Sequence, residues 1–162
     1  MDSLKLELET INLQSLSIRK NVLPTIKNFG YESPQMDSLN SLIKSFDSLA
    51  LNKVESIIST YGWLGKSKVG ELANTTLFII VQHANDNSVR EKFYPLLEES
   101  VNEGESRPSD WATMRDRILI QNGKPQIYGT QTDHAGQLLP VENRKELNKR
   151  RRRVGLKRIK ID

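Results

Sequence analysis

The chain of 162 residues contains no cysteine and only two histidines, His83 and His134. Without cysteine, disulfide bonds, thiol nucleophiles and thiolate metal sites are excluded. A zinc site would need carboxylates for its remaining ligands, and no cofactor-binding fingerprint is present. The sequence therefore predicts neither a metal nor a cofactor.

Long apolar runs are also missing. No segment approaches the roughly 20 apolar residues that a membrane-spanning helix needs, and the N-terminus lacks the basic and apolar regions of a signal peptide. We therefore expect a cytoplasmic protein with no membrane partner. The length suits one domain, residues 1–162, with a core of its own.

Positive charge is concentrated at the C-terminus. Residues 142–162 carry ten Lys and Arg against three Asp and Glu, whereas residues 1–141 carry fourteen against seventeen. The overall net charge of +4 is therefore a property of the tail. It is weak evidence that the body of the protein binds nucleic acid.

Apolar residues at spacings of three and four predict a mostly α-helical, compact domain. An N-terminal helix and loop form residues 1–34, with the helix over Leu4–Ile18 and a loop over Asn28–Gln35. A second helix covers Met36–Ile58, capped by Asp37 or Ser38 and ended by Gly62. Residues 159–162 are expected to form a tail.

The run that follows Ser67, its expected cap, is apolar nearly all round. Its β-branched residues, Thr75, Thr76 and Ile79–Val81, are a competing strand signal. We favour a helix because the run is long and has no internal turn residue. Two further helices are expected, over Ser88–Glu103 and from a cap at Ser109 or Asp110 to about Ile120.

The C-terminal third is expected to contain a short β-hairpin. Gln126–Gln131 has strand character, Thr132–Gln137 reads as an exposed turn that contains His134, and Leu138–Val141 pairs back. A last helix over Glu142–Arg153 ends at Gly155. It turns Leu147, Val154 and Leu156 inward, and Ile159 and Ile161 follow as a short strand or a frayed end.

Six short motifs occur in a fixed order: YGW at 61–63, S-x-VG at 67–70, QHA at 82–84, DR at 116–117, Q-x-YGTQ at 126–131 and RR-x-x-GL at 151–156. In this order they resemble a bacterial domain family of unknown function, over about residues 35–158. The chain departs from that pattern at Leu64, where the family commonly has proline, and at Asn85, where it often has an acidic residue. The resemblance implies a shared fold and a shared polar site, without a known activity.

His83 is the first candidate for chemistry, because an imidazole titrates near neutral pH and can act as a general base. Gln82 beside it could orient a ligand, and Asp86 or Asn87 falls on the same helical face. The alternative is a core histidine that donates to a backbone carbonyl.

Asp116 and Arg117 form the second candidate group. If Asp116 faces His83 it could orient the imidazole, and Arg117 could hold a carboxylate or phosphate. An ordinary interhelical salt bridge explains the pair equally well, and Arg115 is read as a solvated neighbour.

A third group would present an amide, a phenol and a hydroxyl on one face of an extended segment. It comprises Gln126, Tyr128 and Thr130, with Gln131 beside them. Such a face suits an uncharged polar ligand or a peptide backbone. The alternative is a loop held by its own side-chain hydrogen bonds.

Two outlying features complete the candidate site. Trp63 covers the core or forms an aromatic wall of the pocket. Within the Arg150–Arg153 run, Arg151 and Arg152 could anchor the C-terminus or reach the pocket. The run has no interleaved aromatic residues, which single-stranded nucleic-acid sites normally show, so nucleic acid ranks third among the partners.

The function favoured by these residues is a small enzyme, a hydrolase or group transferase acting on a polar ligand, with His83 as base and Asp116 and Tyr128 in support. The runner-up is a non-catalytic binding or protein-interaction domain whose polar cluster is structural or grips a peptide.

Overall fold

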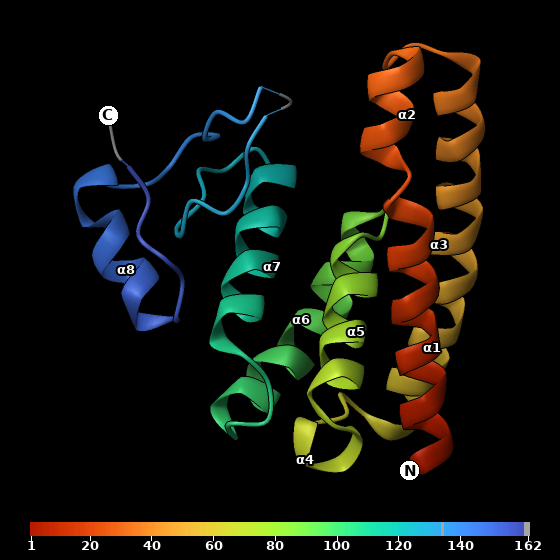
Figure 1. Ribbon diagram of the computed structural model, residues 1–162. Helices are drawn as coiled ribbons and strands as arrows, with labels where there is room; N and C mark the ends of the chain where they lie inside the picture. Colours follow the sequence, from red (N-terminus) through yellow and green to blue (C-terminus); the bar gives the residue numbers. More distant parts are fainter. Residues whose placement is uncertain (134, 161–162) are drawn as a thin grey trace. The chain divides into compact units, whose positions relative to one another are not determined.

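The computed structural model describes residues 1–133 and 135–160, and it divides into two compact units, Met1–Ala84 and Asn85–Asp162 (Figure 1). The expectations for His134 and Ile161 lie outside the described residues. The single domain over 1–162 and its proposed subdivision stay predictions.

The first unit is a helical bundle. Its helices are α1 (Asp2–Arg19), α2 (Val22–Phe29), α3 (Pro34–Tyr61), α4 (Lys66–Val69) and α5 (Glu71–Gln82). Helix α1 packs against both α3 and α5. The core of this unit consists of aliphatic side chains that are at most 4% exposed, among them Leu8, Ile11, Val54, Ile58, Leu77 and Val81.

Helix α3 begins earlier than the sequence pattern suggested. Its N-cap is Ser33, whose Oγ accepts from Met36 N at 3.2 Å, so the prediction of Asp37 or Ser38 as cap was wrong. The preceding segment is also not all loop, since α2 extends to Phe29. Pro24 fits in the first turn of α2 because an amide there has no intrahelical acceptor.

The end of α3 and the identity of α5 were predicted correctly. Gly62 follows Tyr61 with a φ of 72°. A residue with a side chain would be strained in this conformation. The β-branched run is helical, as α5, but Ser67 is not its cap. Ser67 lies inside the short α4, and Gly70 (φ 84°) precedes α5 instead.

The second unit contains α6 (Asn87–Asn102), α7 (Pro108–Gln121), the 3-10 turn η1 (Arg144–Glu146) and α8 (Leu147–Arg153). Helices α6 and α7 pack together. Asp86 caps α6 by accepting from Ser88 N at 2.9 Å, and Pro108 occupies the first position of α7, where it loses no hydrogen bond. The buried apolar side chains are Phe93, Leu97, Ala112, Met114, Leu147 and Val154.

The prediction of a β-hairpin in the C-terminal third was wrong. In the part of the chain that the structure describes there is no β-strand, only isolated bridges between Gln126 and Val141 and between Thr132 and Leu138. The backbone of residues 126–131, called the 126–131 loop below, bonds mainly to side chains. A segment whose amides are already taken this way cannot form a ladder with a neighbouring strand.

The C-terminal residues pack against the second unit largely as expected. Leu147 and Val154 are buried and Leu156 is half-buried, although the helix itself begins only at Leu147. Ile159 does not fray, because its N–H donates to Asn148 Oδ1 and its carbonyl accepts from Asn148 Nδ2. Across residues 1–133 and 135–160, no helix is long and apolar enough to cross a membrane.

We predict that Ser33→Ala lowers the free energy of unfolding by about 1 kcal/mol, because Met36 N then loses its acceptor at a buried helix start. Ser33 Oγ also donates to Gly30 O at 2.8 Å. Urea unfolding followed by circular dichroism measures the change. The exposed Ser38, changed to alanine, is the matched control and should have little effect. A larger loss for Ser38→Ala than for Ser33→Ala would contradict the capping assignment.

Candidate functional site

A buried carboxylate organises the polar residues of the second unit. Asp116 lies on α7 with a fully buried side chain. Its Oδ1 accepts from Ile127 N at 2.7 Å and Tyr128 N at 3.0 Å. Its Oδ2 accepts from Thr130 N at 3.0 Å and from the Thr130 hydroxyl at 2.9 Å. These donors match the roughly four acceptor positions of an ionised carboxylate.

Gln126 closes the 126–131 loop from within. This fully buried side chain donates from Nε2 to Gln131 O at 2.8 Å and to Leu139 O at 3.0 Å, and its Oε1 accepts from Gln131 N at 2.8 Å. One amide thus supplies Gln131 with the two backbone partners that a neighbouring strand would offer.

Two arginines of α8 bind the carbonyls on the other side of the loop. Arg150 Nε donates to Ile127 O at 2.7 Å. Arg151 Nη1 donates to Tyr128 O at 2.7 Å and Gly129 O at 3.0 Å. Of the two arginines expected to anchor the C-terminus or reach the pocket, Arg151 is buried and bonded to the loop, whereas Arg152 is exposed.

Gly129 is the one position of the loop where only glycine fits. Its φ is 64°, and an added Cβ would lie 3.2 Å from Leu147 Cδ2 and 3.3 Å from Cδ1. Both strain and crowding therefore oppose a side chain. The close approach lets the first residue of α8 pack directly under the loop.

Arg117 and Gln131 complete the network. Arg117 Nε donates to Gln131 Oε1 at 3.0 Å, and Gln131 Nε2 donates to the Thr130 hydroxyl at 2.9 Å. Burial lowers the pKa of Arg117 from its usual value. Burial also lowers the pKa of Arg151, opposed by the negative charge of Asp116.

The loop places the Tyr128 ring beside two other aromatic side chains, and we call Tyr94, Trp111 and Tyr128 the aromatic row. The ring centroids of Trp111 and Tyr128 are 5.8 Å apart, and those of Tyr94 and Trp111 are 6.0 Å apart. The guanidinium of Arg115 lies 5.9 Å from the Trp111 ring and donates from Nη1 to the Tyr94 hydroxyl at 3.2 Å. All four side chains are half-buried.

Both tyrosines of the row are weak acids. Burial raises the pKa of Tyr94 to about 12 although Arg115 opposes the shift, and burial likewise raises the pKa of Tyr128. Both phenols therefore keep their protons at neutral pH. The sequence reading missed Tyr94, Trp111 and Arg115 as site residues; the signal for two of them was the spacing of four that puts Trp111 and Arg115 on one face of α7.

Three predicted site residues belong to the first unit. His83 is exposed at the end of α5, in a backbone conformation of φ −91° and ψ 2°, and Gln82 before it is buried. Trp63 is half-buried, and its indole Nε1 is buried with no hydrogen-bond partner among the described residues. The catalytic roles of His83, Asp116 and Tyr128, and the ligand-binding roles of the other predicted residues, stay predictions.

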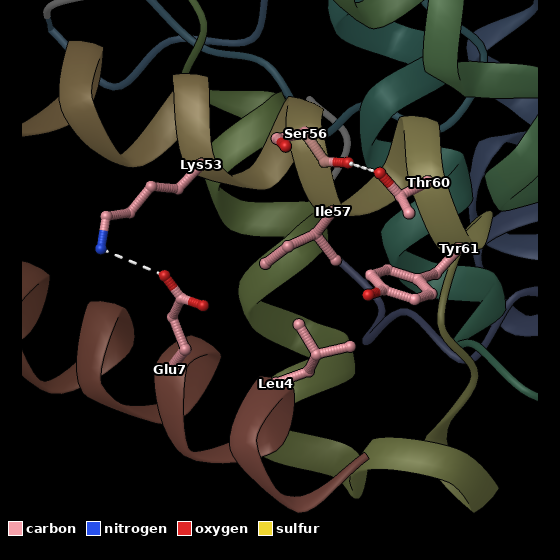
Figure 2. A pocket seen from close by; sticks show the side chains of 7 residues that line it. All are labelled: Leu4, Glu7, Lys53, Ser56, Ile57, Thr60 and Tyr61. Carbon is pink, nitrogen blue, oxygen red and sulfur yellow. Dashed lines mark hydrogen bonds and ion pairs between the residues drawn. The ribbon is translucent and has the colours of Figure 1, made fainter.

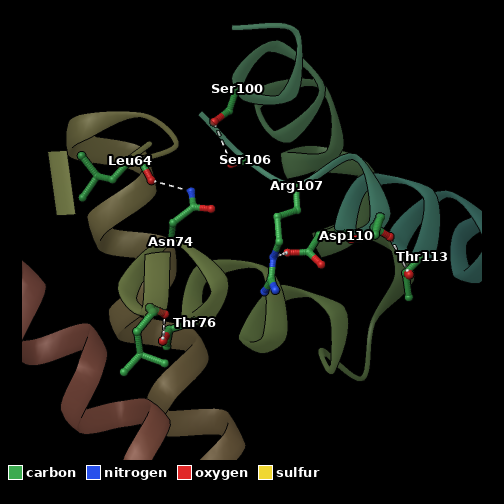
Figure 3. A network of polar contacts seen from close by, with 10 residues as sticks. Leu64, Asn74, Thr76, Ser100, Ser106, Arg107, Asp110 and Thr113 are labelled. Carbon is green, nitrogen blue, oxygen red and sulfur yellow. Dashed lines mark hydrogen bonds and ion pairs between the residues drawn. The ribbon is translucent and has the colours of Figure 1, made fainter. Parts of the chain in front are cut away.

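Other polar side chains bind locally within each unit (Figure 3). In the first unit Asn74 Nδ2 donates to Leu64 O at 2.8 Å and fixes the turn before α4. In the second unit the Ser100 and Ser106 hydroxyls lie 2.8 Å apart, and Arg107 Nε donates to Asp110 Oδ2 at 3.3 Å. Burial raises the pKa of Asp110, and Arg107 opposes that shift.

In the second unit, then, the site is a side-chain-bonded loop held between helices, with an aromatic row at its edge. In the described part of the chain no three His, Asp or Glu side chains are grouped as metal ligands. The model of a family of unknown function, DUF6624, matches residues 3–161, and the chain belongs to this family. The match covers more of the chain than the 35–158 expected. No curated protein and no solved structure matches the chain.

We predict that Asp116→Ala lowers the free energy of unfolding by about 3 kcal/mol or more, because three backbone amides then lose a charged acceptor in a buried setting. Urea unfolding measures the loss. Hydrogen exchange at Ile127, Tyr128 and Thr130 should accelerate. The control is Asp133→Ala: Asp133 Oδ1 also accepts from two amides, of Ala135 and Gln137, but on the surface. Equal losses for the two variants would rule out an organising role for Asp116.

Proposed function

We propose that this protein is a non-catalytic binding domain whose contact surface is the aromatic row with Arg115. The supporting observation is that the 126–131 loop is bonded to Asp116 and Arg151 through its backbone. The Tyr128 side chain takes no part in those bonds. A backbone held by side-chain hydrogen bonds fixes the position of the ring that it carries, as a binding surface needs.

The composition of the surface favours a peptide or protein segment as partner. Tyrosine, tryptophan and arginine are the residues that dominate the binding energy of protein interfaces. The neutral phenols can donate hydrogen bonds, and Arg115 offers a cation beside the Trp111 ring. Nucleic acid is disfavoured because Arg150 and Arg151 are already bound to carbonyls of the loop.

We predict that Tyr128→Ala weakens binding by about 2 kcal/mol, roughly 30-fold, without unfolding the loop. The probes are peptides selected from a random displayed library against the wild-type protein, with affinities measured by calorimetry. Hydrogen exchange at Thr130 reports whether the loop is intact.

Tyr31→Ala is the matched control, because Tyr31 is 65% exposed in the first unit. It should leave the affinity unchanged. If no peptide is enriched, or if the selected peptides bind Tyr128→Ala as well as the wild type, the proposed surface is wrong.

A second candidate function is a small hydrolase or group transferase with His83 as general base. The observation in its favour is that His83 is exposed to solvent at a helix end, where an imidazole can reach a substrate. The acceptor positions of Asp116 are occupied by the 126–131 loop, so this proposal assigns the chemistry to His83 itself.

For this enzyme we predict that His83→Gln abolishes turnover of ester and phosphoester probes while the melting temperature stays within a few degrees of wild type. Glutamine keeps one of the hydrogen bonds that imidazole offers. Asn85→Ala, an exposed neighbour, serves as control. The proposal of an enzyme is contradicted if turnover survives in His83→Gln, or if the wild-type protein turns over none of the probes.

A further inference from the structure

The first unit contains a pocket whose lining residues belong to neither of the two proposed functions. It lies between α1 and α3 and has a volume of about 290 Å³, at the small end of ligand-binding pockets. Helix α3 contributes one face of its last turns, and α1 contributes two residues one turn apart. The lining residues are Leu4, Glu7, Lys53, Ser56, Ile57, Thr60 and Tyr61 (Figure 2).

The pocket has a polar end and an apolar end. At the polar end Lys53 Nζ lies 3.1 Å from Glu7 Oε1, with both side chains partly exposed. At the other end the side chains of Leu4 and Ile57 point toward one another, and the Tyr61 ring lies beside them (Figure 2). Ile57 is only 6% exposed and forms the floor, whereas Tyr61 is 51% exposed.

The spacing of the two ends follows from the helix. Lys53 and Ile57 are four residues apart on α3, a rise of about 6 Å along the axis. A ligand that spans both ends is therefore small: one charged group, a short link and one apolar group fill it.

The charges of the polar end select among such ligands. A carboxylate that approaches Lys53 also meets Glu7, and an ammonium group that approaches Glu7 also meets Lys53. A ligand with both charges avoids this repulsion, because each of its groups meets an opposite charge. Opening the existing ion pair costs little, since a solvent-exposed pair contributes little to stability.

We propose that this pocket binds a free amino acid with a branched aliphatic or aromatic side chain. The carboxylate lies on Lys53, the ammonium group lies on Glu7, and the side chain enters the apolar end between Leu4, Ile57 and Tyr61. The site belongs wholly to the first unit and is independent of the aromatic row.

The test is a titration of the full chain, followed by backbone amide NMR shifts. The probes are leucine and phenylalanine, with glycine as the amino acid that lacks a side chain. Isocaproate is leucine without the amino group, and isoamylamine is leucine without the carboxylate. We expect leucine or phenylalanine to shift the amides of Glu7, Lys53 and Ile57, and each single-charge analogue and glycine to bind at least roughly tenfold more weakly.

Substitutions in and outside the pocket test whether the ligand binds there. Leu4→Trp fills the apolar end from a half-buried position and should abolish the shifts, and Lys53→Met should weaken leucine while leaving isoamylamine at least as strong. Leu42→Trp, at a position 54% exposed on α3, is the matched control and should bind as the wild type. Absence of saturable shifts with leucine and phenylalanine, isocaproate binding as strongly as leucine, or unchanged binding by Leu4→Trp would overturn the proposal.

Discussion

The carboxylate of Asp116 is the group on which the second unit depends. Removing a charged group from water costs several kcal/mol, and Asp116 is fully buried. That cost is offset because its oxygens receive charge-assisted hydrogen bonds from Ile127, Tyr128 and Thr130, each worth about 1.5–3 kcal/mol. The loop and the carboxylate therefore stabilise one another, since either alone would leave buried polar groups without partners.

Side chains of opposite charge bind different groups of the loop backbone. The carboxylate, which can only accept, binds the N–H groups of the 126–131 loop, while Arg150 and Arg151, which can only donate, bind its carbonyls. The loop thereby connects α7 to α8. A hairpin would need a second strand to satisfy the same groups, and here two helices supply the partners instead.

Helices α1, α3 and α5 to α7 could be predicted from the sequence because their signals are local: apolar spacing, Gly62 after α3, and the absence of turn residues within α5. The short helices α2 and α4 were not predicted. The 126–131 loop could not. Its residues have the side chains of a strand, and nothing in them shows that Ile127 N bonds to a carboxylate eleven residues earlier or Tyr128 O to a guanidinium 23 residues later. The pattern singled out Asp116, Gln126 and Thr130 as polar residues in apolar surroundings, but hydrogen bonds between side chain and backbone leave no periodicity to detect. Tyr94 and Trp111 were missed for a related reason, since half-buried aromatic residues on helices resemble ordinary core residues.

The same network changes what a high density of polar residues means for function. In the sequence, Asp116, Gln126 and Thr130 favour an active site, because buried polar groups need a reason to be there. In the structure each of the three bonds to the 126–131 loop or forms part of it, so holding the loop is reason enough. A network whose acceptors are filled by its own backbone has little left for a substrate. What it can offer a partner is the side chain that its bonded backbone holds in place, and in this loop that side chain is Tyr128 beside Trp111. The proposed binding surface therefore depends on the hydrogen bonds that hold the loop rather than on its polarity.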